Sequence, residues 1–456
     1  MPADSPAWFP YMTQLARQLR VVDYFTLGFG TMIGVGWLVV MDDWLGRGGP
    51  LGAVLGFAIG GALLLPIGYV YGQLVAAMPD AASEIAYTAR VFPQPISFAA
   101  GWMMLLAYFI VCPFEAVAIG RVAAYLFPSL DSMELYRLAG KPVYLPHLAV
   151  GLGLTAVITA INYRGIRASA RFQKWNTFAV LALFVVVVSC GAARGSPAHL
   201  EPPFSRGGLV SVLLVLQIVP YFMTGFESVA KSAEEASPEF RSRGFFRAIL
   251  ASLLVGTVFY TAVIAAVAYV APWKELVSER FATAVAFERA FHSRWLLNLI
   301  FATALFSLLK VFNGNFVAAS RLLFALGRRR MAEPRLGRVH PVNRTPWVAV
   351  LGIGLATAVT MCLGDAILVP ISEVGSAASA AGWFAACAAY WALKPSPARR
   401  AVAVGGAVVA GLLLLMKLLP FVPGHFTWHE YAALGLWWLV GLLLRWTKTS
   451  AAEPAA

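Results

Sequence analysis

Long apolar segments separated by short polar loops run along almost the whole chain of 456 residues. A helix needs about 20 mostly apolar residues to cross a bilayer, and twelve segments of this chain approach that length. Glycine- and proline-rich turns such as Gly48-Gly49-Pro50 separate neighbouring segments. The predicted spans are 21–45, 51–77, 94–126, 144–162, 173–193, 209–231, 246–271, 294–328, 346–363, 367–393, 400–420 and 428–447. The pattern therefore predicts an all-α membrane protein with twelve transmembrane helices.

Two of these spans contain signs of an interrupted helix. Four glycines lie between Gly28 and Gly36 in the first span, and each costs a helix about 1 kcal/mol relative to alanine. The sixth span carries Gly225 shortly after Tyr221-Phe222. Interrupted spans at matching places in two halves point to the substrate site of a transporter, and unwound backbone at membrane depth must face a cavity. Alternatively, Gly34 and Gly36 permit close helix packing.

A second pattern relates the two halves of the chain. A short helix-like connector at 80–92 follows the second span, and another at 278–292 follows the seventh. Together with breaks in spans one and six, this shift of five predicts that spans 6–10 repeat spans 1–5 upside down. The expected units are an N-terminal segment 1–20, a first repeat 21–195, an inverted second repeat 205–395, two further helices within 399–447 and a tail 448–456.

The composition fits a membrane protein, with 60% hydrophobic and only 12% charged residues, whereas soluble domains are about 25% charged. The formal charge of +13 does not indicate nucleic-acid binding, because the basic residues lie in short loops between apolar segments. With the N-terminus inside, most of these residues fall on cytoplasmic loops, as at 328–330. We therefore expect a multi-pass protein of the cell membrane with both termini cytoplasmic.

Catalytic and metal-binding patterns are missing from the sequence. The cysteines form no CxxC motif or Cys/His cluster and are interpreted as packing residues, and the histidines fall at loops or span ends. No Ser/His or Asp/Asp grouping lies at membrane depth, and no ring of polar residues indicates a channel. We expect no enzymatic activity, no metal and no cofactor. The cysteines are Cys112, Cys190, Cys362 and Cys387.

Four ionisable residues lie within predicted spans, where such groups are rare and often functional. Glu115 follows Pro113 in the third span and is predicted to hold a second positive charge of the substrate; the alternative is an ion pair with Arg121 or Lys310. Glu227 follows the second break. Desolvation disfavours the charged carboxylate, which makes Glu227 a candidate for proton coupling, the alternative being a hydrogen bond to freed backbone. The four residues are Glu115, Glu227, Lys310 and Glu373.

The breaks themselves offer complementary backbone groups. The half-helix that starts at Gly36 presents free N–H groups, which suit a substrate carboxylate. The half-helix that ends near Phe222 presents carbonyls, which suit an ammonium. This pair predicts recognition of a small amino acid or amine by backbone atoms.

The sequence resembles the amino acid–polyamine–organocation transporter family, which has the leucine-transporter-like fold. The resemblance rests on Gly30-Thr31-Met32-Ile33-Gly34-Val35-Gly36, on Gly225-Phe226-Glu227-Ser228 and on Ala319-Ser320-Arg321. It implies secondary transport by alternating access, an inverted repeat of five plus five helices with the first and sixth discontinuous, and two peripheral helices. It also implies a substrate site and a set of coupling or gating residues. The substrate-site residues are Ile33, Gly34, Val35, Gly36, Cys112, Glu115, Tyr221, Phe222, Gly225 and Asn315; the coupling or gating residues are Trp37, Glu227, Lys310 and Glu373.

Some positions depart from the family pattern or stay open. Val35 replaces a serine that is usual in the first break, which weakens the case for a carboxylate. Tyr221 takes the position of an aromatic gate, although simple packing is the alternative. Many proton-coupled relatives carry a lysine in the fifth span that replaces a sodium ion. Here that lysine is missing, and Lys310 in the eighth span is expected to fill the sodium position unless it pairs with a carboxylate.

We therefore predict a sodium-independent, proton-linked symporter or exchanger of amino acids, cationic or amine-bearing. The alternatives are a carrier of polyamines or small organic amines and, less favoured, a sodium-coupled carrier or a channel. The expected partners are the substrate, protons and the lipid bilayer, in a monomer or homodimer that binds no nucleic acid.

Overall fold

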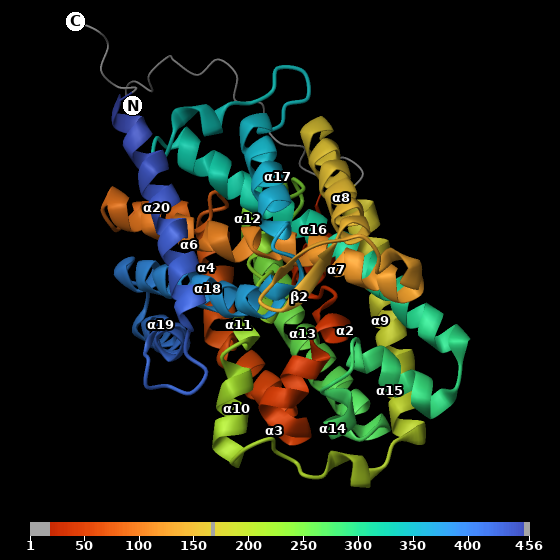
Figure 1. Ribbon diagram of the computed structural model, residues 1–456. Helices are drawn as coiled ribbons and strands as arrows, with labels where there is room; N and C mark the ends of the chain where they lie inside the picture. The colour runs from red at the N-terminus through yellow and green to blue at the C-terminus, as the bar shows by residue number, and fades with distance from the viewer. Residues whose placement is uncertain (1–18, 166–168, 451–456) are drawn as a thin grey trace, which may run out of the picture.

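The computed structural model describes residues 19–165 and 169–450, which fold into a bundle of long helices (Figure 1). The first and last predicted units, 1–20 and 448–456, lie largely outside these residues. The helices of the first half are α1 (Val21–Met32), α2 (Gly36–Val39), α3 (Met41–Leu63), α4 (Leu65–Ala77), α5 (Glu84–Ala89), α6 (Gln94–Phe109), α7 (Val111–Leu126), α8 (Leu145–Arg164) and α9 (Ser169–Arg194). Those of the second half are α10 (Gly208–Leu216), α11 (Val219–Met223), α12 (Ser228–Lys231), α13 (Arg243–Val270), α14 (Trp273–Leu276), α15 (Ala282–Phe291), α16 (Arg294–Arg328), α17 (Trp347–Met361), α18 (Leu368–Ala392), α19 (Pro397–Leu418) and α20 (Trp428–Ser450).

Nine helices or helix pairs in the described part of the chain are long and apolar enough to cross a membrane. Three predicted spans are not among them. The segment 209–231 is divided into α10, α11 and α12, the segment 346–363 forms the 15-residue α17, and the segment 428–447 forms α20. The predicted helical membrane protein is confirmed, whereas the count of twelve spans stays a prediction.

The helix boundaries follow local sequence. α6 ends at Phe109 and α7 begins at Val111. The break is explained by Pro113, because a proline ring clashes with the carbonyl four residues before it, here that of Phe109. In α3 the helix bends at Gly49, whose φ of +63° is open to glycine at little steric cost. This bend falls in the predicted turn Gly48-Gly49-Pro50 and precedes the part of α3 that crosses the membrane.

A small hairpin was not expected from the apolar pattern. Strands β1 (Glu134–Leu138) and β2 (Lys141–Tyr144) pair antiparallel in the loop between α7 and α8. Every residue of β1 is exposed. The segment is too polar and too short to register as a span, so a search for membrane helices passes over it.

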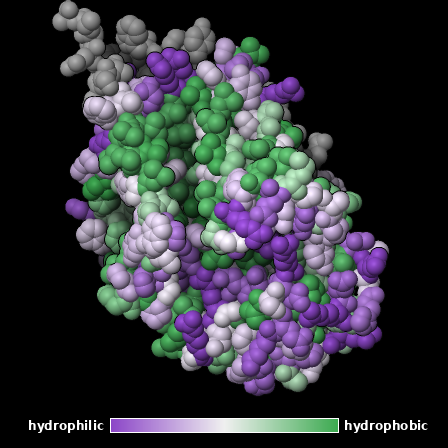
Figure 2. Space-filling model, in the orientation of Figure 1, coloured by the Kyte–Doolittle hydropathy of each residue, from purple (hydrophilic) through white to green (hydrophobic). Residues whose placement is uncertain are grey.

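The outer surface of the bundle is apolar over wide areas. Figure 2 shows a broad hydrophobic area, with hydrophilic residues gathered mostly toward the lower end of the view. Large apolar side chains on several helices point outward, with Leu355 69% exposed, Leu436 62% and Val258 59%. A soluble protein rarely exposes such contiguous apolar surface, so these side chains are suited to contact lipid.

Helix α1 runs through the middle of the packing. It contacts α9, α12, α13 and α16. Its residues from Gly28 to Met32 are all buried. The element that carries the first predicted break is therefore surrounded by protein rather than by lipid.

Candidate functional site

Both predicted helix breaks are present. α1 ends at Met32 and α2 begins only at Gly36, and Ile33 between them has extended backbone. In the second half, α11 ends at Met223 and α12 begins at Ser228. Glycine-rich sequence in a membrane span thus correctly indicated where the backbone unwinds.

The two breaks pack directly against each other. Gly225 has φ +134°, and a Cβ atom added there would lie 2.6 Å from the backbone nitrogen of Met32. A Cβ added at Gly36 would lie 2.6 Å from the Phe222 ring. Glycine is needed at both positions because each lets the other break approach closely.

Side chains of α13 and α16 satisfy the carbonyl groups that the first break frees. The donors come from Tyr260, Ser307 and Asn315, all of them buried. The bonds run from Asn315 Nδ2 to Thr31 O (3.1 Å), from Tyr260 OH to Met32 O (3.2 Å), and from Ser307 Oγ to Ile33 O (2.9 Å) and Gly34 O (3.1 Å). Asn315 was predicted to face the site; Ser307 and Tyr260 were missed because isolated hydroxyl residues carry no distinctive pattern.

A narrow cavity of about 20 Å³ lies between the two breaks. Aromatic and aliphatic side chains form most of its wall, and Glu115 is the one charged residue among the described residues that line it. The lining residues are Thr31, Met32, Gly34, Gly36, Val111, Phe114, Glu115, Tyr221, Phe222, Thr224, Tyr260 and Val311. Five of the predicted substrate-site residues line this cavity, whereas Cys112 is buried within α7. The five are Gly34, Gly36, Glu115, Tyr221 and Phe222.

Glu115 lies against the first break. Its Oε1 is 2.5 Å from the point that a Cβ on Gly34 would occupy, and the backbone N–H of Val35 faces the carboxylate. Its Oε2 is buried and has no hydrogen-bond partner within residues 19–165 and 169–450. Arg121, one alternative partner, instead pairs with Asp365 at 3.3 Å. Glu115 therefore lies at the break itself, and its Oε2 is available to accept a hydrogen bond from a substrate.

Lys310 is fully buried on α16 between the side chains that hold the first break. Its Nζ lies 5.5 Å from the centre of the Phe29 ring and has no hydrogen-bond partner in the described part of the chain. No carboxylate of the described residues comes within 4 Å of it. The alternative of a direct salt bridge is therefore not seen, although Glu115 is close enough to act on Lys310 electrostatically.

Glu227 caps the second break. Its Oε2 accepts a hydrogen bond from the backbone nitrogen of Gly225 at 3.1 Å, while its Oε1 has no partner among the described residues. One turn further, Lys231 pairs with Glu84 of α5 at 2.8 Å, and Tyr71 OH donates to the same carboxylate at 2.7 Å. The pair is 1% and 0% exposed. It joins the second break to the connector helix. Neither residue was singled out from the sequence, because Glu84 lies in the connector and Lys231 at the very end of a predicted span.

Glu373 lies apart from the cavity. It pairs with Arg47 at 2.6 Å and with Lys417, and Arg47 also pairs with Asp43 at 2.7 Å. This cluster joins α3, α18 and α19. The structure thus separates Glu373 from Glu115, although the sequence allowed all four intramembrane charges to face one cavity.

The aromatic residues also divide into those that line the cavity between the breaks and those that lie apart from it. Tyr221 packs against Phe114 and Phe222, with ring centres 5.7 Å and 4.9 Å apart, and lines the cavity. Phe222 in turn meets Trp44, which sequence analysis did not consider, at 4.7 Å. Trp37 instead contacts Phe259 and lies beside a separate small cavity.

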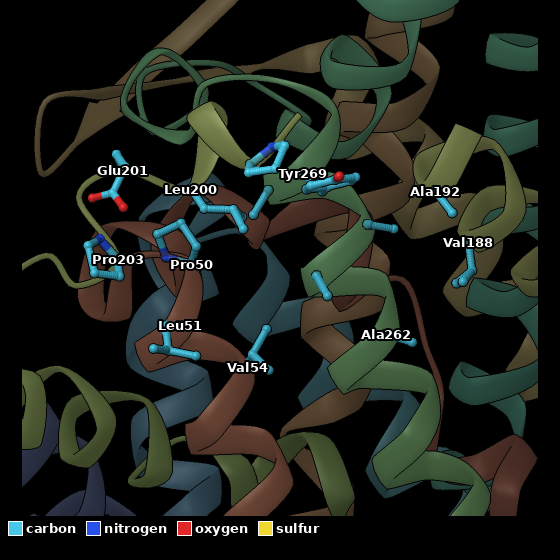
Figure 3. A pocket seen from close by; sticks show the side chains of 14 residues that line it. Pro50, Leu51, Val54, Val188, Ala192, Leu200, Glu201, Pro203, Ala262 and Tyr269 are labelled. Carbon is cyan, nitrogen blue, oxygen red and sulfur yellow. The ribbon is translucent and has the colours of Figure 1, made fainter. Parts of the chain in front are cut away.

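A larger cavity of about 780 Å³ lies elsewhere, between α3, α9 and α13 (Figure 3). Its wall is formed by small or apolar side chains such as Val54, Val188 and Ala262, with Glu201 at its edge. It shares no residue with the cavity between the breaks. Size alone would choose this cavity, but a transport site needs convergent polar groups, and those lie at the breaks.

Comparison with known proteins agrees with this geometry, because residues 19–443 match the amino acid permease family. The chain belongs to this family. It is 25% identical over 446 residues to the branched-chain amino acid permease BcaP of Bacillus subtilis (strain 168), covering 94% of this chain and 92% of the relative. The amino-acid permease RocC of the same organism is 25% identical over 439 residues, covering 91% and 87%. A methylthioribose transporter, also of Bacillus subtilis, is 25% identical over 340 residues, covering 73% and 72%.

Membership in this family confirms the resemblance inferred from the two breaks. The protein is a multi-pass membrane transporter rather than an enzyme. Among the described residues, no group of three or more histidine, cysteine or acidic side chains is arranged to hold a metal ion.

Proposed function

We propose that the protein is a sodium-independent, proton-linked secondary transporter of cationic or amine-bearing amino acids. The observation that carries this proposal is the position of Glu115, a buried carboxylate in the cavity between two unwound helices. A buried carboxylate with a free oxygen favours a positively charged partner. The names of the relatives BcaP and RocC support amino acids as the solute class.

Sodium independence is proposed from Lys310. The carbonyls that a sodium ion would use at the first break already accept hydrogen bonds from Ser307 and Asn315. Lys310 lies on α16 between Ser307 and Asn315 in sequence, and its buried amino group lies near Phe29 of α1. A fixed ammonium removes the need for a bound cation, so transport is expected to continue when sodium is replaced.

Proton linkage is proposed from Glu227. Its carboxylate caps the backbone of the second break, so a change in its charge alters the stability of that break. The neighbouring pair of Lys231 and Glu84 extends the polar contacts to α5. Protonation of Glu227 is therefore suited to bias the two arrangements of α11 and α12 that alternating access requires.

Alternating access further requires closures on both sides of the cavity. Arg47 and Glu373 join α3 to α18 at 2.6 Å. Arg321 of α16 binds Glu235 at 2.6 Å and the carbonyl of Lys231 at 3.2 Å. We propose these two clusters as the outer and inner closures, with Arg47 facing the outside and Arg321 facing the cytoplasm.

The finer architecture is part of the same proposal. Helices α1–α9 form a first repeat of five spans (21–195) and α10–α18 an inverted second repeat (205–395). Helices α19 and α20 (399–447) are peripheral, which gives twelve spans with both termini in the cytoplasm. The direct contact between the two breaks, through Gly225 and Met32, supports this pairing of the halves.

Counterflow in liposomes containing the purified protein tests the proposal. We expect saturable exchange of a labelled cationic amino acid such as lysine, unchanged when choline replaces sodium and stimulated by an inward proton gradient. A non-saturable flux would indicate a channel, and an obligatory need for sodium would contradict the role of Lys310.

A further inference from the structure

The carboxylate of Glu115 occupies the place at the first break where an amino acid substrate would put its own carboxylate. Its Oε1 fills the space beside Gly34, and the N–H of Val35 faces it. Val35 offers no hydroxyl group. The protein itself thus places a carboxyl group at the position where the unwound backbone offers its donors.

The backbone acceptors of the same break are also engaged. Tyr260, Ser307 and Asn315 donate to its successive carbonyls. An incoming ammonium therefore finds few free carbonyls there. The carboxyl oxygen that it does find in the cavity is Oε2 of Glu115, which is buried and has no hydrogen-bond partner in the chain as described. The hydroxyl groups of Thr31 and Tyr221, which line the same cavity, also have no partner among the described residues.

The remaining wall suits an apolar body. Most of the wall is apolar, with four aromatic rings and three aliphatic side chains beside the hydroxyl groups of two threonines. The aromatic residues are Phe114, Tyr221, Phe222 and Tyr260, the aliphatic ones Met32, Val111 and Val311, and the threonines Thr31 and Thr224. Aromatic faces attract an ammonium group and pack against alkyl or aryl carbons. No second charged side chain lines the cavity among the described residues, so neither a substrate carboxylate nor a second ammonium has a charged partner in its wall.

We infer that this site takes a monoamine that lacks a carboxylate, an alkylamine or arylalkylamine, whose ammonium binds Glu115 while its carbon chain lies among the aromatic residues. The cavity of about 20 Å³ is too small for such a molecule, so the two breaks must move apart to admit it. This inference rests on the proposed transport function and moves the preferred substrate from amine-bearing amino acids, which would bind more weakly, to the corresponding amines. A free carboxylate on the substrate is disfavoured because the carboxyl group of Glu115 already fills the space beside Gly34 and faces the N–H of Val35.

Matched pairs of amino acids and their decarboxylated amines test the inference on the purified full-length protein. The pairs are phenylalanine with phenethylamine, leucine with isoamylamine, and lysine with cadaverine. Binding is measured as the rise in melting temperature with concentration. Each monoamine is expected to stabilise the protein at a concentration at least tenfold lower than its parent amino acid. Cadaverine, a diamine, is expected to bind more weakly than isoamylamine.

Variants connect this preference to Glu115. Glu115→Gln should weaken monoamine binding at least tenfold, whereas Glu115→Asp should retain part of it because the charge is kept. Glu134→Gln is the matched control, since Glu134 is an exposed carboxylate that pairs with Arg137 on the hairpin. Should Glu115→Gln fail to fold, the matched pairs on the unmodified protein decide the matter.

Two outcomes would overturn the inference, and they can be told apart. If amino acids bind at equal or lower concentration than their amines, a substrate carboxylate displaces Glu115; the inference then fails while the proposed transport of amino acids stands. If neither member of any pair binds, the inference and the proposed substrate class fail together.

Discussion

Gly225 of the second break lies on the end of α1 so closely that a Cβ atom would come within 2.6 Å of the Met32 nitrogen. Two unwound segments about 190 residues apart thus support each other's unusual backbone. Neither could unwind at membrane depth alone, because freed backbone groups in lipid are costly. The cavity at their junction follows from this contact.

Gly225→Ala tests the contact. The φ of +134° is a conformation that side-chain-bearing residues rarely adopt, and it costs on the order of 1–3 kcal/mol. We expect a lower melting temperature and a loss of most uptake. Gly153→Ala is the control, because Gly153 lies within α8 and a Cβ there meets nothing within 4 Å. Uptake equal to that of the control would contradict the close contact.

Ser307→Ala tests whether the hydroxyl of Ser307 stabilises the first break by donating hydrogen bonds to its backbone carbonyls. Removing the hydroxyl leaves the carbonyls of Ile33 and Gly34 without that donor, at a cost of about 1–3 kcal/mol. A thermal unfolding series should show the loss, together with reduced substrate affinity. The control is Ser278→Ala, because the hydroxyl of Ser278 donates to an exposed carbonyl, that of Glu275. Equal stability of the two variants would argue against the role of Ser307.

The buried pair of Lys231 and Glu84 offers a double-mutant cycle. Lys231→Met or Glu84→Gln alone leaves a buried group without its partner and should destabilise by about 3–5 kcal/mol. The double variant should recover part of this loss. Arg137 and Glu134, an exposed pair at 2.7 Å, should show little coupling in the same cycle. Additive effects for Lys231 and Glu84 would mean that the pair does not act as a unit.

Glu227→Gln tests proton linkage. The amide keeps a polar group near Gly225 but does not change its charge with pH. We therefore expect a transport rate that varies much less between pH 5 and pH 8 than that of the unmodified protein. Glu288→Gln serves as the control, because the carboxylate of Glu288 on α15 accepts a hydrogen bond from Tyr125 and none from either break. A variant at Glu227 that retains the original pH profile would place proton coupling elsewhere.

Replacement of Lys310 by methionine tests the sodium position. The unmodified protein should transport equally well in sodium and in choline. Lys310→Met removes the charge beside Phe29 and should lower transport in both media. If sodium, but not choline, partly restored transport by the variant, the result would support a position of the Lys310 ammonium where a sodium ion could bind. Full activity of the variant without sodium would contradict it.

The order of apolar and small residues along the chain predicts much of the architecture. Apolar runs of about 20 residues must become helices in a bilayer, since helices satisfy all of their own backbone groups. The glycines from Gly28 to Gly36 and at Gly225 located both breaks, because glycine weakens a helix wherever it is placed. These features depend on neighbours in sequence, and the sequence alone was enough to predict them.

Which charges meet was decided only by the tertiary structure. Glu115, Lys310, Glu227 and Glu373 have the same standing in the sequence, as single ionisable residues in apolar spans. Yet Glu373 pairs with Arg47 and Lys417, Glu227 caps its own break, and Glu115 lies against Gly34. A one-residue step along a helix turns the direction of the side chain by about 100°. Small changes in helix packing therefore decide which charged group each side chain meets. The sequence therefore determined where the helices open, while the packing of distant helices decided what the opening holds.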